Sequence, residues 1–408
     1  MRLFFFLLVA AILCINCKTK ETFQFSLEET VNFLASDSLK GRATGTLEEQ
    51  QAAAFLANQL KELGFAPKGV EETYLQTFTF METRDPHKEV EFITAGEGTT
   101  TGTNVIGFYD KKAEKTIVLG AHYDHLGMGG QGSLHRGDPE IHNGADDNAS
   151  GVATVLKIAE KLKDSLMSTN ILVQFYSGEE MGLLGSNYYV KNPTLEMNEI
   201  NFMINLDMVG RLREDKSLSI SGVGTSSRWN QSLNVNNPGF KLILKESGIG
   251  PSDHTSFYLA DIPVLHFFTG QHEDYHRPSD DSEKLNYEGM NEIADYIVAV
   301  CMDLDNSPKL TFKMTKNESE EVPRFKVGLG VVPDYLFDGK GMRIDGVSEN
   351  KPAQKAGLQK GDVVVQLGDS LITDMMSYMR TLSTFEKGDA TKAVVDRNGE
   401  KIEVDIEF

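Results

Sequence analysis

The fold is decided between His122 and Asp207, where four motifs read Ala121-His122-Tyr123-Asp124, Gly144-Ala145-Asp146-Asp147-Asn148, Ser177-Gly178-Glu179-Glu180 and Asn205-Leu206-Asp207-Met208. Short apolar runs come just before three of these motifs, at residues 116–121, 171–176 and 202–206. Runs of this kind favour buried strands of a parallel sheet. The acidic and imidazole side chains are therefore expected at the ends of strands.

Their placement predicts a metal site. Open α/β sheets bind ligands in the crevice at the carboxyl ends of their strands. Carboxylates gathered there repel one another, and a divalent cation relieves the repulsion. Mixed nitrogen and oxygen ligands without Cys are typical of a catalytic zinc site. The stretch offers more carboxylates than one ion needs, which favours two metals about 3.5 to 4 Å apart that share a bridging carboxylate.

A fifth motif, Tyr275-His276-Arg277-Pro278-Ser279-Asp280, follows later in the chain. Together and in this order, the five motifs resemble the di-zinc aminopeptidase family, which includes bacterial leucyl aminopeptidase, plasma glutamate carboxypeptidase and glutaminyl cyclase. The resemblance covers residues 26–305. A single Asp-Asp or Glu-Glu pair is usually a solvated turn, and a single His after a strand is usually structural. Five motifs in the family's order favour the metal site instead.

The resemblance implies two Zn²⁺ ions, with Asp146 bridging them, Glu180 and His276 completing one, and His122 and Asp207 completing the other. It also implies that Glu179 is the general base, which takes a proton from water and passes it to the leaving amine. Asp124 would hold the His122 imidazole in the right tautomer. A cis peptide is implied between Asp146 and Asp147.

Other polar residues near the motifs are less decisive. In the family an Asp-His pair near Asp253 and His254 lines the pocket, although surface hydrogen bonding explains the pair equally well. His135 and His142 are expected to be loop residues, because the implied ligand set is complete without them.

The N-terminal residues predict export. Residues 1–17 combine a short positive start with an apolar core that is too short to span a membrane. Cys17 follows Asn16 and resembles the lipid-attachment position of bacterial lipoproteins; plain secretion is the alternative. We expect a periplasmic or extracellular protein. Cys301 is then the one Cys left, and it is expected to be a core residue.

Length and charge narrow the function. The chain has 408 residues, which suits two or three domains, and its formal net charge is -20. Such acidity argues against a nucleic-acid partner, because a phosphate backbone binds Lys and Arg.

Strand-like and helix-like patterns alternate along residues 26–305. Helices are expected within 26–63, from 148 or 150 to 162, and at 287–304, with strands at 74–80, 89–93 and 262–268. The loop 41–46 is expected to connect the first two helices, and a position at the border of the crevice is the alternative. The predicted fold class is α/β, with a doubly wound, mostly parallel central sheet.

The last part of the chain predicts a second domain. Residues 306–323 are polar and read as a linker. Residues 324–408 resemble a PDZ domain, most specifically in Ala356-Gly357-Leu358-Gln359-Lys360-Gly361-Asp362. Such a domain binds a peptide C-terminus. It could grip the substrate while the zincs act at the other end, or simply pack against the first domain with its groove empty.

The predicted function is therefore a zinc exopeptidase that removes N-terminal residues of peptides. Glutaminyl cyclisation and dipeptide carboxypeptidase activity are alternatives within the same family. A non-enzymatic peptide-binding protein is the alternative outside it.

Overall fold

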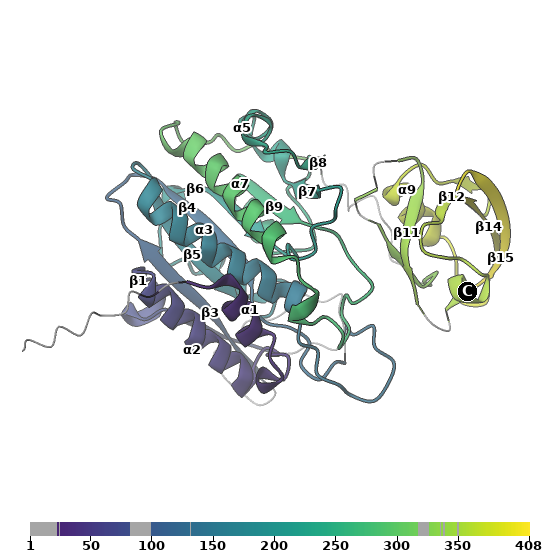
Figure 1. Cartoon of the computed structure of the whole chain (residues 1–408), viewed down its shortest axis with the longest axis horizontal. Helices are drawn as coiled ribbons and strands as arrows, with labels where there is room; N and C mark the ends of the chain where they lie inside the picture. The colour runs from purple at the N-terminus through teal and green to yellow at the C-terminus, as the bar shows by residue number, and fades with distance from the viewer. Residues whose placement is uncertain are drawn as a thin grey trace, which may run out of the picture.

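A computed structural model describes residues 25–81, 99–130, 132–316, 326–334, 336–337, 339–348 and 351–408, together with Phe23 (Figure 1). The predicted export signal at 1–17 with Cys17, the strand at 89–93 and the part of the linker at 317–323 lie outside these ranges. Among the described helices, none is both long and apolar enough to cross a bilayer.

The larger sheet has parallel strands at its centre. β5 (Asn170–Tyr176), β4 (Thr116–His122), β6 (Ile200–Leu206) and β9 (Val264–Phe268) lie side by side in this order and run parallel. The three apolar runs of the sequence thus form neighbouring strands, and all seven residues of β4, β5 and β6 are buried. The carboxyl ends of these strands consequently meet at one edge.

The outer strands make the sheet mixed. They are β1 (Ala66–Pro67), β2 (Leu75–Met81), β3 (Thr99–Tyr109), β7 (Ser217–Ser221) and β8 (Lys241–Lys245). β3 pairs antiparallel with β5, and β7 pairs antiparallel with β9. The α/β fold class is confirmed, with its parallel ladders concentrated where the four motifs lie.

Helices cover both faces of this sheet. One face carries α1 (Leu27–Leu34), α2 (Leu47–Glu62), α3 (Gly151–Ser165), α5 (Trp229–Asn236) and α7 (Tyr287–Asp305). The other carries α4 (Leu184–Lys191) and α6 (His254–Tyr258). Short 3-10 turns lie at Asp37–Leu39, Val70–Glu72, Met197–Glu199, Val223–Thr225 and Ser282–Lys284.

Local sequence explains where the first helices begin. Ser26 and Thr46 accept hydrogen bonds from the backbone N–H groups of Glu29 and Glu49, so each satisfies a free donor of its helix. Gly64, at φ 87°, follows the second helix as expected.

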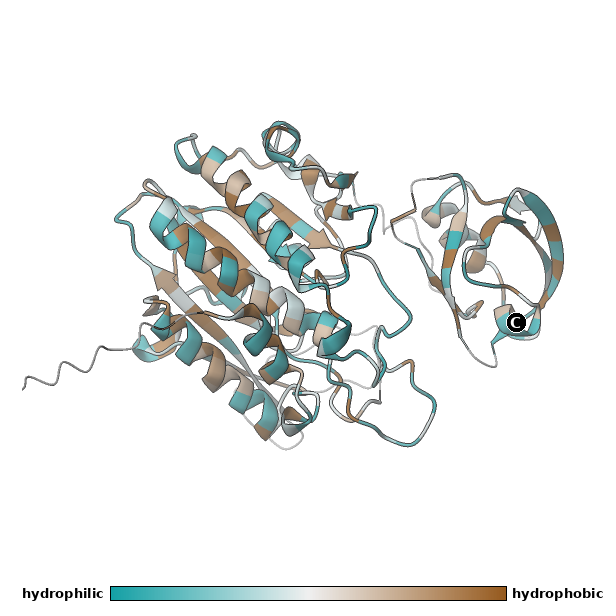
Figure 2. Cartoon of the chain, in the orientation of Figure 1, coloured by the Kyte–Doolittle hydropathy of each residue, from teal (hydrophilic) through white to brown (hydrophobic). Residues whose placement is uncertain are grey.

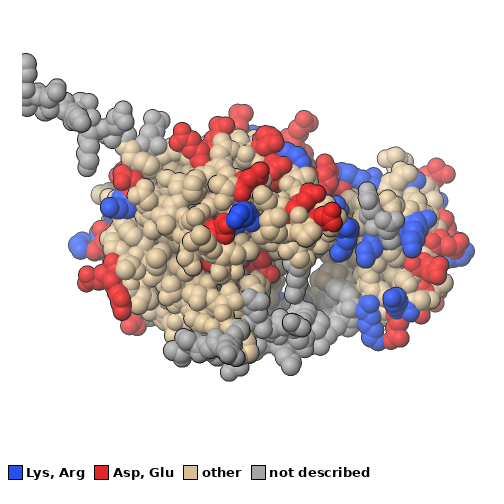
Figure 3. Space-filling view, turned by 90° about the horizontal axis from the view of Figure 1, so that it is seen from below, with Lys and Arg blue, Asp and Glu red and all other residues tan. Residues whose placement is uncertain are grey.

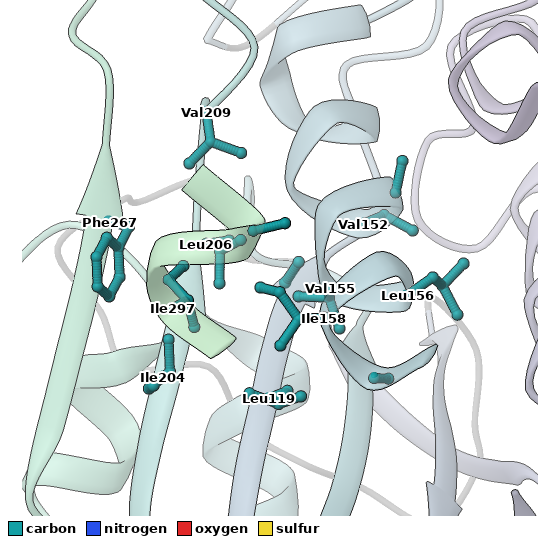
Figure 4. Packing of buried hydrophobic residues seen from close by; sticks show 14 of the residues in the cluster. Leu119, Val152, Val155, Leu156, Ile158, Ile204, Leu206, Val209, Phe267 and Ile297 are labelled. Atoms are coloured by element: carbon teal, nitrogen blue, oxygen red, sulfur yellow. The ribbon is translucent and has the colours of Figure 1, made fainter. Parts of the chain in front are cut away.

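The main core lies between the sheet and helices α3 and α7. Figure 4 shows Val155 and Ile158 of α3 and Ile297 of α7 above Leu119 and Ile204 of the sheet, all fully buried. In Figure 2 the central strands are hydrophobic, and the helices carry hydrophilic residues on the side turned away from the sheet. The packed helices hold the strand ends in fixed positions.

A second domain follows with its own core. It contains β10 (Val331–Pro333), β11 (Met342–Val347), α8 (Pro352–Lys355), β12 (Val363–Leu367), β13 (Ser370–Leu371), α9 (Met375–Leu382), β14 (Ala390–Arg397) and β15 (Glu400–Glu407). Its sheet has the order β10-β11-β12-β14-β15, with β13 beside β12. Buried side chains such as Val364, Ala393 and Ile406 form a cluster separate from the core of the first domain.

Candidate metal centre

Two groups of potential metal ligands meet at the carboxyl ends of the parallel strands. The first consists of His122, Asp147 and Asp207, and the second of His125, Asp147 and Glu180. Within each group the ligand atoms lie within 4.8 Å of one another. Asp147 belongs to both groups.

Asp147 lies between two imidazoles. Its Oδ1 is 3.2 Å from His122 Nε2, and its Oδ2 is 3.2 Å from His276 Nε2. His122 Nε2 is also 3.5 Å from Asp207 Oδ1, while His276 Nε2 is 3.2 Å from Glu180 Oε2. One carboxylate oxygen of Asp147 therefore lies beside His122 and the other beside His276, and each of these histidines has a second carboxylate next to it.

Asp146, the residue expected to bridge, points elsewhere. Its Oδ1 accepts hydrogen bonds from Gly210 N and Ser150 Oγ, and its Oδ2 lies 3.1 Å from His272 Nε2. The physical reason is the local backbone: the N–H groups of both Asp146 and Asp147 donate to Asp280 Oδ2, at 2.9 and 3.1 Å. The turn is anchored so that the second Asp of the pair enters the crevice.

The cis peptide also lies one residue later than expected. It joins Asp147 to Asn148 and not Asp146 to Asp147. Asn148 lies just before α3, and its Oδ1 accepts the N–H of Gly151, the first residue of that helix, at 3.0 Å. Its Nδ2 donates to the carbonyl of Leu206 at 2.9 Å, which ties this turn to the end of β6.

Charge in the crevice favours cations beside the carboxylates. Burial opposes ionisation of Asp147, but contacts with His122 and His276 lower its pKa well below 3.8. Burial and the charge of Asp147 oppose ionisation of Glu180, yet His276 and His125 lower the Glu180 pKa to about 2. The carboxylates raise the pKa of His276 to about 11 against the effect of burial. A divalent cation supplies this positive charge directly.

Glu179 stands beside the ligand atoms without joining either group. Its Oε2 is 4.0 Å from His122 Nε2. Burial, despite the opposing charge of His122, raises the pKa of Glu179 well above 4.5. A carboxylate whose pKa is raised is a stronger proton acceptor than an ordinary Glu side chain.

Asp124 lies behind His122. Its backbone carbonyl is 3.2 Å from His122 Nδ1, and its Oδ1 is 3.7 Å away. Its carboxylate accepts hydrogen bonds from Thr44 Oγ1 and from the N–H of Glu179, at 3.0 and 3.2 Å. Asp124 thus connects the ends of β4 and β5.

Arg42, which lies in the loop expected to connect the first two helices, binds the backbone next to the candidate metal centre. It is fully buried and donates to the carbonyls of Tyr123, Asn143 and Gly144, and to Leu34 O. Burial lowers its pKa to about 10, opposed by the charges of nearby carboxylates such as Asp147. One side chain therefore fixes the backbone on both sides of the ligand-bearing turns.

Two histidines near the centre do not follow from the motifs. His125 Nδ1 is 2.8 Å from Glu180 Oε1, and His272 pairs with Asp146 as described. His125 directly follows Asp124 at the end of β4, and this position in the sequence could have identified it as a candidate ligand.

The remaining candidates lie outside the two groups. Burial raises the pKa of Asp253 to about 7. His254 stacks on His266, with ring centroids 4.5 Å apart. His142 contacts Ser133 and His135 contacts Glu140, so both are loop residues as expected.

The centre opens into a cavity of about 450 Å³. Its lining includes His122, Asp147, Glu179, Glu180, Asp207, Tyr275 and His276, and the apolar residues Met208, Ile249, Phe268, Met376 and Met379. Tyr275 stacks on His276 with ring centroids 3.8 Å apart. Met376 and Met379 come from α9 of the second domain.

Comparisons with known proteins agree with this architecture. The chain is 30% identical over 241 residues to aminopeptidase YwaD of Bacillus subtilis, which covers 54% of this chain and 50% of that protein. It thus spans about half the length of that curated relative. A solved zinc aminopeptidase from Bacillus subtilis matches 71% of this chain and 98% of its own, with a TM-score of 0.54 and 19% identity. A glutaminyl cyclase of Bacteroides thetaiotaomicron matches 69% of this chain and 99% of its own, with a TM-score of 0.53 and 19% identity.

Family profiles match both parts of the chain. Peptidase family M28 matches residues 104–301, which contain all four motifs of the strand ends and the His276 loop. A PDZ domain matches residues 308–408. The resemblance seen in the sequence is confirmed: the chain carries a domain of peptidase family M28 followed by a PDZ domain.

Proposed function

We propose that this chain is a zinc-dependent aminopeptidase with a two-metal centre. The observation that carries the proposal is the position of Asp147, whose two carboxylate oxygens face His122 and His276 separately. A carboxylate shared in this way is what a two-metal site requires.

The donor set fits zinc. We assign His122 and Asp207 to one ion and Glu180 and His276 to the other, with Asp147 between them. Imidazole nitrogen and carboxylate oxygen are common zinc ligands. Glu180 Oε1 is buried and lies 2.8 Å from His125 Nδ1, so an imidazole nitrogen and a carboxylate oxygen, both of which can bind zinc, already meet in the crevice.

Glu179 is the proton carrier of the proposed reaction. When bound, zinc polarises the scissile carbonyl and makes a water molecule easier to deprotonate. The Glu179 carboxylate takes the proton from that water and gives it to the amine that leaves when the peptide bond breaks. Asp124 keeps the His122 ring and the Glu179 backbone in place through the contacts described above.

The N-terminus of a peptide suits this cavity better than its C-terminus. Four carboxylates, Asp147, Glu179, Glu180 and Asp207, line the cavity. A free amine can donate hydrogen bonds to carboxylate oxygens that do not ligate a metal, whereas a terminal carboxylate has no hydrogen to donate. The named relatives with aminopeptidase activity support the same choice.

The test is hydrolysis of aminoacyl anilides and short peptides with free or acetylated N-termini. We expect release of N-terminal residues that chelation abolishes, zinc restores and acetylation blocks. Glu179→Gln should retain zinc and lose roughly 10²- to 10⁴-fold in kcat. Zinc bound with no release from any peptide would refute aminopeptidase activity. The next measurements would then be cyclisation of N-terminal glutamine and peptide binding.

We also propose an exported location, on the sequence of residues 1–17 alone. Cell fractionation should place the protein outside the cytoplasm. Labelling with a radioactive fatty acid that Cys17→Ser abolishes would support a lipid anchor, and an unlabelled exported protein would support plain secretion.

A further inference from the structure

The PDZ domain contributes to the catalytic cavity. Met376 and Met379, on successive turns of α9, line the same cavity as His122 and Glu179. Both methionines are partly exposed. In the part of the cavity lining that comes from the M28 domain, the large apolar residues are Met208, Ile249 and Phe268. These five residues form an apolar wall of the cavity, and they come from two domains.

Charged contacts hold α9 in this position. Arg213 of the M28 domain lies 3.2 Å from Asp334 Oδ2 and 2.9 Å from Asp345 Oδ2 of the PDZ domain. The side chains of Asp334 and Asp345 are only 1% and 10% exposed, so these pairs are largely shielded from solvent. Lys360 adds a contact at 3.2 Å to Glu273. Figure 3 shows acidic and basic side chains side by side where the domains meet.

An apolar contact lies next to these pairs. Leu336 of the PDZ domain is 2% exposed, and a Cβ added at Gly270 would come within 2.9 Å of its Cδ1. Gly270 has φ +100° and belongs to the loop that leads to His276. The PDZ domain thus rests on the loop that carries one of the proposed metal ligands.

We propose that Met376 and Met379 contact the N-terminal side chain of the substrate and select large apolar residues. The proposal rests on the aminopeptidase activity proposed above and assigns its specificity to the PDZ domain. Methionine is unbranched and polarizable, and it adapts to apolar groups of different shapes. The wall accordingly suits Leu, Met and Phe rather than one of them alone.

The first test compares the double variant Met376→Ala/Met379→Ala with the zinc-loaded wild type. We expect kcat/KM for leucine and phenylalanine anilides to fall about ten-fold, because lost apolar contacts cost this much in a specificity pocket. Turnover of alanine anilide, whose side chain is too short to use the wall, should change less than two-fold. The matched control is Met167→Ala, since Met167 is 75% exposed and does not line the cavity.

The second test is designed to displace α9 while it leaves Met376 and Met379 unchanged. Arg213→Glu should place like charges opposite Asp334 and Asp345 and reduce leucine over alanine preference as strongly as the double variant. In the Arg213→Glu background, removing both methionines should have little further effect, because the two changes act on one feature. Adding Asp345→Arg to Arg213→Glu should restore the preference in part.

The outcomes separate the two proposals. A wild type that releases N-terminal residues, combined with a leucine-to-alanine ratio unchanged in Met376→Ala/Met379→Ala, would overturn the role of α9 and leave the aminopeptidase proposal intact. A zinc-loaded wild type with no release from any substrate would overturn both. Equal losses on leucine and alanine anilides would mean a general structural effect, and this too would contradict selection by the wall.

Discussion

Asp146 and Asp147 are adjacent in sequence but have different surroundings. Both residues are carboxylates before a helix, and the motif alone cannot tell which enters the crevice. The choice depends on contacts from distant residues, namely Asp280 below the turn and Gly210 and His272 beside Asp146. The sequence therefore predicts that His122, Glu180, Asp207 and His276 meet in one crevice, but it names Asp146 where the structure brings Asp147 between the imidazoles.

Zinc content distinguishes the two aspartates. Asp147→Asn should reduce zinc binding at both positions and lower activity by roughly 10³-fold or more, because it removes a shared ligand. Asp146→Asn should retain both ions with about 10- to 100-fold weaker affinity, as expected for a group that only orients the site. Metal analysis after dialysis against graded zinc measures both. Loss of both ions in Asp146→Asn alone would reverse the assignment.

Asp334 gives a prediction about pH. Burial opposes its charge, but hydrogen bonds from Arg343 and the charge of Arg213 lower its pKa below 3.8. Because the folded pKa is lowered, the stabilisation by Asp334 is complete above pH 3.8 and is lost as pH falls through the folded value. Asp334→Asn should cost about 2 kcal/mol of unfolding free energy at pH 7.

Denaturant unfolding at several pH values checks this prediction. The difference between Asp334→Asn and the wild type should be constant from pH 7 to about pH 5 and shrink toward pH 3. A difference that grows as the solution is acidified would contradict the sign.

At the scale of elements, apolar patterning predicts the centre of the fold well. The three apolar runs form β4, β5 and β6, and the helix expected at 287–304 is α7, each within one or two residues of the expected bounds. β7 and β8 are not predicted, although Ser217-Leu218-Ser219-Ile220-Ser221 alternates as a half-buried strand should. A strand as short as β7 is hard to recognise from its own sequence, because its pairing with another strand, here β9, is what stabilises it.

Helix α4 sets the position of the Glu179-Glu180 turn through one close contact. A Cβ added at Gly185 would lie 2.2 Å from Asn104 Oδ1 and 2.5 Å from the carbonyl of Ser177. Gly185→Ala should therefore push α4 away from the end of β5, cost about 1 to 3 kcal/mol and lower kcat. Urea unfolding together with anilide hydrolysis measures both effects. Wild-type stability and activity in this variant would show that the turn does not depend on α4.

At the scale of the whole molecule, the described residues form two domains with separate cores, which meet through charged contacts such as Arg213–Asp334 and through Leu336. The sequence predicts both domains, because each has its own motifs. It cannot predict that α9 reaches the catalytic cavity, since no local pattern encodes contacts between domains. The contacts of Arg213 with Asp334 and Asp345 agree with the expected packing of the PDZ domain against the first domain, and its grip on a substrate C-terminus stays a prediction.

Separate cores predict separate responses to metal removal. The proposed zinc site exists only in the folded M28 domain, so a zinc concentration about 1,000-fold above its dissociation constant should add about 4 kcal/mol to the stability of that domain. Calorimetry with chelator or excess zinc should show one transition that shifts and one, from the PDZ domain, that stays. Equal shifts of both transitions would mean that the two bodies unfold as one.

The long separation between His122 and Met379 also has a consequence during synthesis. The ribosome delivers β4, β5 and β6 before the His276 loop, and α9 emerges about a hundred residues after that loop. Domains generally fold in the order in which they leave the ribosome. A nascent chain would thus complete its ligand set before it acquires the methionine wall, so it would pass through a stage able to hold metal but not yet selective.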